Sequence, residues 1–228
     1  MFYMWYYYSM NINYKQLTDE LISHFGEYHN LLDVPINGLI WENLLYNSLI
    51  NQSNNVIWKS GSHQTGTDIQ FEGIGISCKG GRLGKGNKKD KFKVSSYRST
   101  SYKTLEEKIN FFSEKHEDVY FCLAYEDAKT KHEYRLFTFD ADILDYRSLN
   151  WKETKSGWKG VGIFQAEIRK KMSDQLWLQL PVHLLTEQFH ITIEKGNKYD
   201  TISNVDVEKL SATATLDSYL VGEHYGIK

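Results

Sequence analysis

Cysteine and proline are both scarce in this chain. Only Cys78 and Cys122 occur among 228 residues, each within an apolar stretch, so neither a disulfide framework nor a zinc site is indicated. This cysteine usage is typical of a protein of the reducing cytoplasm, which is the compartment we expect. Only two prolines occur, Pro35 and Pro181, which predicts long, uninterrupted helices and strands.

Long apolar runs are missing as well. No stretch approaches the roughly 18–20 residues of a membrane span, and residues 1–9 lack the basic and aliphatic parts of a signal peptide. We interpret residues 1–9 either as an aromatic arm or as an extension upstream of a true start at Met10. With 41% hydrophobic and 25% charged residues, the sequence predicts one globular domain over residues 1–228 and no membrane partner.

Positive charge is concentrated in one segment, although the net charge is only −2. Residues 79–103 contain nine basic residues and one acid, whereas the rest of the chain contains 18 basic and 28 acidic residues. Such a segment is either a solvated loop or a phosphate-binding surface. Basic and hydroxyl side chains of these types contact DNA phosphates and base edges. The candidate DNA contacts are Lys85, Lys88, Lys89, Lys91, Lys93, Ser95, Ser96 and Arg98.

Hydrophobic periodicity predicts a mixed α/β fold, with a mixed sheet flanked by helices. Helices are expected from Leu17 to a stop at Gly26, over residues 37–50, from a capping box at Thr104 and Glu107, and over residues 164–177. Strands are expected over residues 56–59, 92–102, 119–125, 134–139 and 189–193, with a glycine- and lysine-rich loop over residues 80–91.

Residues 67–81 read as a tight β-hairpin. A two-residue turn at Glu72-Gly73 places Asp68 opposite Ser77 and puts Lys79 on the same face as both. The other face carries apolar side chains: Ile69, Phe71, Ile74, Ile76 and Cys78. The acid and the amine form either a cross-strand surface ion pair or part of a functional site.

Asp68 followed by Ser77-x-Lys79 resembles the PD-(D/E)XK nuclease motif, in the Ser-x-Lys form of some type II restriction endonucleases. The resemblance implies that Asp68 and the backbone carbonyl of Cys78 bind Mg²⁺ and that Lys79 assists the attacking water. The chain departs from the pattern twice, because Thr67 replaces the proline and Ser77 replaces the second carboxylate. Ser77 is a weak metal ligand, so a carboxylate from elsewhere in the chain must act as the second metal ligand beside Asp68.

Three glutamates compete for that role. Glu42 interrupts the apolar stripe of the helix at residues 37–50, where a carboxylate is uncommon unless it reaches water at the boundary. Glu107 belongs to the downstream helix, but the capping box already gives it a structural role. Glu72 occupies the turn, roughly 13 Å along the strand from Asp68. We therefore rank Glu42 first.

The resemblance covers residues 37–140 and implies an αβββαβ core, with C-terminal recognition and dimerisation elements. It implies a homodimeric type II restriction endonuclease that hydrolyses double-stranded DNA with Mg²⁺. The alternatives are another nuclease on the same core, for DNA repair or junction resolution, and a non-catalytic nucleic-acid-binding module in which Asp68 and Lys79 form only an ion pair.

Overall fold

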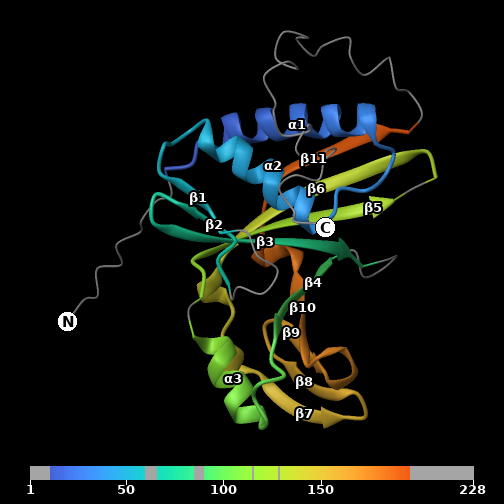
Figure 1. Cartoon of the computed structure of the whole chain (residues 1–228). Coiled ribbons are helices and arrows are strands. Elements are labelled where there is room, and N and C mark those ends of the chain that lie inside the picture. Colours follow the sequence, from blue (N-terminus) through green and yellow to red (C-terminus); the bar gives the residue numbers. More distant parts are fainter. Residues whose placement is uncertain (1–10, 60–65, 85–89, 115, 128, 196–228) are drawn as a thin grey trace, which may run out of the picture.

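The structure, a computed structural model, describes residues 11–59, 66–84, 90–114, 116–127 and 129–195. These residues form a mixed α/β fold with three α-helices and one large mixed sheet (Figure 1). The helices are α1 (Tyr14–Leu31), α2 (Gly38–Ile50) and α3 (Leu105–Ser113). The strands are β1 (Val56–Trp58), β2 (Ile69–Phe71), β3 (Ile74–Leu83), β4 (Lys91–Arg98), β5 (Val119–Asp127), β6 (Lys131–Asp140), β7 (Asn150–Thr154), β8 (Gly157–Val161), β9 (Gln165–Arg169), β10 (Gln175–Pro181) and β11 (Thr186–Glu194).

The main path of the sheet runs β11-β6-β5-β3-β4-β10-β9-β8-β7, and the β1–β2 pair joins it at β3. Strands β3 and β5 are parallel and the other paired strands are antiparallel. Helices α1 and α2 lie over the part built from β11, β6, β5 and β3, whereas β4, β10, β9, β8 and β7 extend away from them (Figure 1). The sheet therefore consists of a helix-covered part and an extension, joined at β3.

Two apolar cores lie on opposite faces of this sheet. Strand β5 shows the division, because Phe121 packs into the core under α1 and α2, whereas Tyr120 and Cys122 pack into the core shared with α3 and the β4–β10 extension. Both faces of β5 are buried, which explains why its sequence is nearly all apolar. The 3₁₀ turns Ala141–Ile143 and Tyr146–Ser148 follow β6 and contribute to the second core.

Helix α2 is fixed at its start and near its middle. The side chain of Asn37 accepts a hydrogen bond from the backbone N–H of Ile40, which satisfies an otherwise unpaired donor of the first turn. The indole Nε1 of Trp41 donates to the backbone carbonyl of Phe121 at 3.2 Å. Glu42 follows Trp41 directly, so the contact that docks α2 also sets the position of Glu42.

The helix expected over residues 164–177 is wrong. These residues form β9, a 3₁₀ turn over Lys170–Met172 and the start of β10. The alternation of buried and partly buried side chains in β9 and β10 follows the two-residue period of a strand. Ser173 and Asp174 adopt positive φ angles at the turn.

Several boundaries also differ from expectation. Helix α1 continues through Gly26 to Leu31, because the apolar face continues to the buried Tyr28 and tertiary packing outweighs the weak helix propensity of glycine. Strand β3 continues to Leu83 into the segment expected to be a loop, because its last residues pair with β4.

The strand expected over residues 92–102 ends at Arg98. The other expected elements are confirmed, including α2, the late strand β11 and the capping box of Thr104 and Glu107. The interpretation of residues 1–9 concerns residues outside the described part of the chain. None of the described helices combines the length and the hydropathy that a membrane crossing requires.

Candidate functional site

The hairpin that carries the motif has the predicted register. Ile69 pairs with Ile76, Gln70 with Gly75 and Phe71 with Ile74. Glu72 and Gly73 have φ angles of 49° and 89°, the positive values that a tight two-residue turn requires. The apolar face of the hairpin is buried under α1 and α2, so the predicted division between its two faces is also correct.

Strand β3 has an unpaired stretch along one edge. On that edge β2 pairs with Ile74–Ile76 and β4 pairs with Gly81–Leu83, so residues 77–80 face no strand among the described residues. The backbone N–H of Cys78 points to this edge, where it donates to Asp68 Oδ2 at 2.7 Å. Because the N–H and C=O of one strand residue point to the same side, the Cys78 carbonyl also faces this edge, beside Asp68.

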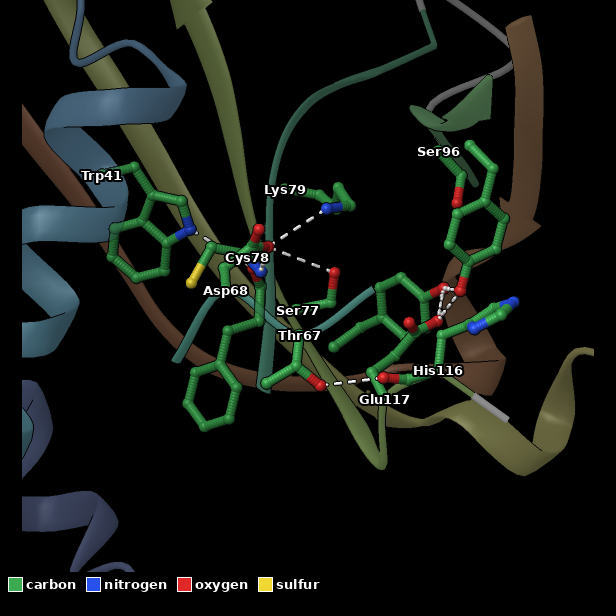
Figure 2. A network of polar contacts seen from close by, with 12 residues as sticks. Trp41, Thr67, Asp68, Ser77, Cys78, Lys79, Ser96, His116 and Glu117 are labelled. Atoms are coloured by element: carbon green, nitrogen blue, oxygen red, sulfur yellow. Dashed lines mark hydrogen bonds and ion pairs between the residues drawn. The ribbon is translucent and has the colours of Figure 1, made fainter. Parts of the chain in front are cut away.

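One carboxylate oxygen collects three hydrogen bonds in this gap (Figure 2). Besides the Cys78 N–H, Asp68 Oδ2 accepts from Lys79 Nζ at 3.2 Å and from Ser77 Oγ at 3.3 Å. Ser77 is fully buried, whereas the Asp68 and Lys79 side chains are 20% and 21% exposed. The structure therefore brings Asp68, Ser77 and Lys79 together, and solvent reaches the charged pair.

Glu42 is electrostatically part of this cluster. Burial and, to a smaller extent, the charge of Asp68 raise the pKa of its carboxyl, Lys79 partly offsets them, and together these effects move this pKa from 4.5 to about 7. Burial alone would lower the pKa of Lys79, but the charge of Asp68 and its hydrogen bond outweigh burial, so this pKa is raised. The charges of two carboxyl groups and one ammonium are thus coupled at this site.

Glu107 and Glu72 lie elsewhere. Glu107 closes the capping box, where Oε2 accepts from the backbone N–H groups of Thr104 and Lys103 at 2.9 and 2.7 Å. These bonds lower the pKa of the Glu107 carboxyl, which is fully exposed. Glu72 is exposed in the hairpin turn. The pKa of Glu42, by contrast, responds to the charges of Asp68 and Lys79.

A divalent cation would find a partial set of oxygen ligands here. Asp68 and Glu42 supply carboxylates and Cys78 supplies its carbonyl, which are the ligand types that Mg²⁺ prefers. In the described part of the chain, no three His, Cys, Asp or Glu side chains form a group that could hold a metal ion. A Mg²⁺ ion held by these few protein ligands would keep several of its waters, as Mg²⁺ usually does.

Sequence reasoning missed a buried carboxyl near this site. Glu117 Oε1 accepts hydrogen bonds from the hydroxyls of Tyr97 and Tyr120, and Oε2 is buried without a hydrogen-bond partner among the described residues. Glu117 also contributes to the raised pKa of Lys79. Figure 2 shows this network on the side of β3 toward which Lys79 and Ser77 point. Its only sequence signal is an acid just before a strand with two buried faces.

The candidate DNA contacts are divided between different environments. Lys91, Lys93 and Ser95 are partly exposed and alternate with the buried Phe92 and Val94. The Ser96 hydroxyl is buried. Arg98 is exposed, and its Nε donates to Gln175 Oε1 at 3.3 Å. Lys85, Lys88 and Lys89 lie outside the described residues.

Comparisons with known proteins give no match: no protein-family model, no curated protein and no solved structure is significantly similar to this chain.

Proposed function

We propose that this protein is a Mg²⁺-dependent nuclease that cuts double-stranded DNA as a type II restriction endonuclease. The observation that carries the proposal is the convergence of three donors on Asp68 Oδ2 at an unpaired strand edge: the Ser77 hydroxyl, the Cys78 N–H and the Lys79 ammonium. The order of elements supports it: α2, β1, β2, β3, α3 and β5, with β5 parallel to β3, follows the αβββαβ order of the PD-(D/E)XK core. Strand β4 is an addition to that order.

Each residue has a defined role in this proposal. Asp68, Glu42 and the Cys78 carbonyl would hold Mg²⁺, which when bound lowers the pKa of water and stabilises charge on the scissile phosphate. Lys79 has a raised pKa and remains an ammonium at neutral pH. It therefore orients the attacking water and stabilises negative charge on the phosphate instead of removing a proton. Ser77 fixes the Asp68 carboxylate by hydrogen bonding.

Incubation of the purified chain with plasmid DNA and Mg²⁺ tests the proposal. Discrete bands from linear plasmid would support sequence-specific cleavage by a restriction enzyme. Cleavage confined to branched or damaged substrates would assign the site to a repair or junction-resolving nuclease. Absence of any Mg²⁺-dependent cleavage on all these substrates would refute the catalytic proposal and leave a binding module.

Two variants connect any activity to this site. Asp68→Asn keeps an acceptor for the Cys78 N–H but removes the charge that a metal requires, so cleavage should be lost while the fold is retained. Lys79→Met keeps the length of the side chain without its ammonium. Wild-type cleavage rates in either variant would contradict the assignment.

A further inference from the structure

The sheet extension has one open face. Where β4, β10 and β9 lie side by side, Val94 pairs with Leu178 and Leu178 pairs with Ala166, and all three side chains are buried in the second core. Because side chains alternate along a strand, the residues between these positions point to the opposite face. Of the described helices, α3 contributes to the second core and α1 and α2 lie over the other part of the sheet (Figure 1). None of these three helices therefore covers the opposite face of β4, β10 and β9.

Basic side chains dominate this open face across six neighbouring strands. Lys93 pairs with Arg82 of β3 and Gln179 of β10, and Lys159 of β8 pairs with Lys152 of β7, so the members of each group share one face. The register places seven basic residues and one acid here. The basic residues are Arg82, Lys91, Lys93, Arg98, Lys152, Lys159 and Arg169, and the acid is Glu167.

Trp177 lies in the middle of this face, between two cations. Lys93 Nζ lies 5.3 Å from the centroid of its ring and Arg169 Cζ lies 5.2 Å from it. Strand β10, which carries Trp177, lies between β4 and β9, so the two cations come from the strands on either side of Trp177. Glu167 Oε2 also accepts from Arg169 Nη2 at 2.7 Å, which holds the guanidinium beside the indole.

We propose that this cationic face binds the phosphate backbone of duplex DNA. Neighbouring strands are about 4.8 Å apart, so the face from β4 to β7 spans roughly 19 Å, enough for contacts with several phosphates. Single-stranded nucleic acid is bound chiefly through aromatic rings on which bases stack. Lys93 and Arg169 already lie over the ring of Trp177, so this ring is not free to act as such a platform.

The position of the face relates it to the candidate site. On β3 the open face includes Arg82 and Gly80 and ends where α1 and α2 cover Cys78. The Cys78 carbonyl lies at this boundary, beside Asp68. A duplex on the cationic face would thus extend toward the gap in β3. The inference rests on the proposed function for its biological meaning, but the binding itself does not require cleavage.

Equilibrium binding of a 20-base-pair duplex, measured by fluorescence anisotropy in EDTA over a range of salt concentrations, tests the inference with the full chain. Lys152→Gln/Lys159→Gln removes two charges on β7 and β8, the strands farthest from β3. The slope of log affinity against log salt should fall by about 1.8, since each lost phosphate contact removes roughly 0.9. The control Lys15→Gln/Lys131→Gln removes two charges on α1 and β6 and should leave the slope unchanged.

Three results would overturn the inference: no duplex binding by the wild-type chain at low salt, an unchanged slope in the β7–β8 variant, or equally tight and equally sensitive binding of a single strand of the same length. The fate of the proposed function is read separately. Duplex binding with the expected change in slope but no cleavage would support the DNA-binding face and refute the nuclease proposal. Cleavage with an unchanged slope would support the nuclease proposal and refute the DNA-binding face.

Discussion

Replacing Glu42 by glutamine should make the protein more stable at alkaline pH while removing its proposed activity. Burial and the charge of Asp68 raise the pKa of Glu42 to about 7, above the 4.5 of an exposed glutamate. Between these two values the folded chain binds more protons than the unfolded chain, so stability falls as the pH rises through this window. The penalty is complete above pH 7 and absent below about pH 4.5.

The size of the effect follows from the shift. Raising a pKa from 4.5 to about 7 corresponds to about 3 kcal/mol, and solvent screening of this half-buried carboxyl reduces the penalty to about 1–2 kcal/mol. Glu42→Gln does not titrate, so its advantage over the wild type should grow by that amount between pH 5 and pH 8. For a chain of this length, the corresponding rise in melting temperature is about 2–8 °C.

Urea unfolding in EDTA at pH 5 and pH 8 measures this difference. Glu107→Gln is the matched control, because hydrogen bonds to the backbone lower the pKa of Glu107. Ionised Glu107 stabilises the fold at pH values above the pKa that this residue has in the unfolded chain, so Glu107→Gln should gain no stability at pH 8. Adding Mg²⁺ at pH 8 should stabilise the wild type by about 2.7 kcal/mol at a hundredfold excess over Kd, and Glu42→Gln much less. An advantage of Glu42→Gln that is the same at both pH values would refute the reasoning.

Further predictions concern the motif and the core. Asp68→Asn and Lys79→Met should each lower the cleavage rate at least 100-fold in a plasmid assay while circular dichroism shows an intact fold, and activity within tenfold of the wild type would contradict this. Ile76→Asp should unfold the protein because Ile76 is 0% exposed, whereas Ile57→Asp, at a position 52% exposed, should cost under about 1 kcal/mol in urea titration. Glu107→Gln should still cut DNA, since glutamine can close the capping box. Sedimentation should show a homodimer, since two-fold symmetry suits a palindromic site, and a monomer both free and bound to DNA would contradict it.

The parts of the fold that sequence predicted best depend on local contacts. The hairpin register follows from Glu72-Gly73, since this pair adopts the positive φ angles of a tight turn and residues on either side alternate. The capping box is equally local, because Thr104 and Glu107 bond to each other's backbone. Where residues within ten positions determine the geometry, the sequence was sufficient.

The segment at residues 164–177 shows how periodicity can mislead. Phe164, Ile168, Met172 and Leu176 recur every fourth residue, a spacing that suits a helix but is also a multiple of the two-residue strand period. The decisive residues are Ala166, which lies between Phe164 and Ile168, and Leu178, which follows Leu176, since both are buried beside Ile168 and Leu176. A helix would place these extra apolar residues on more than one face, whereas β9 and β10 place Ala166, Ile168, Leu176 and Leu178 in one core.

The cationic face could not be read from the sequence, because Lys152 and Arg82 come together only through the strand order β3-β4-β10-β9-β8-β7. The local clue to Glu42 was stronger, since a carboxylate in an apolar helix stripe without a partner on that helix must find its environment elsewhere. The docking of α2 supplies that environment. The indole of Trp41 donates a hydrogen bond to the Phe121 carbonyl of β5, and this contact places Glu42, the next residue, near Asp68. Sequence could identify Glu42 as unusual, but only the packing of α2 on the sheet makes its pKa depend on Asp68 and Lys79.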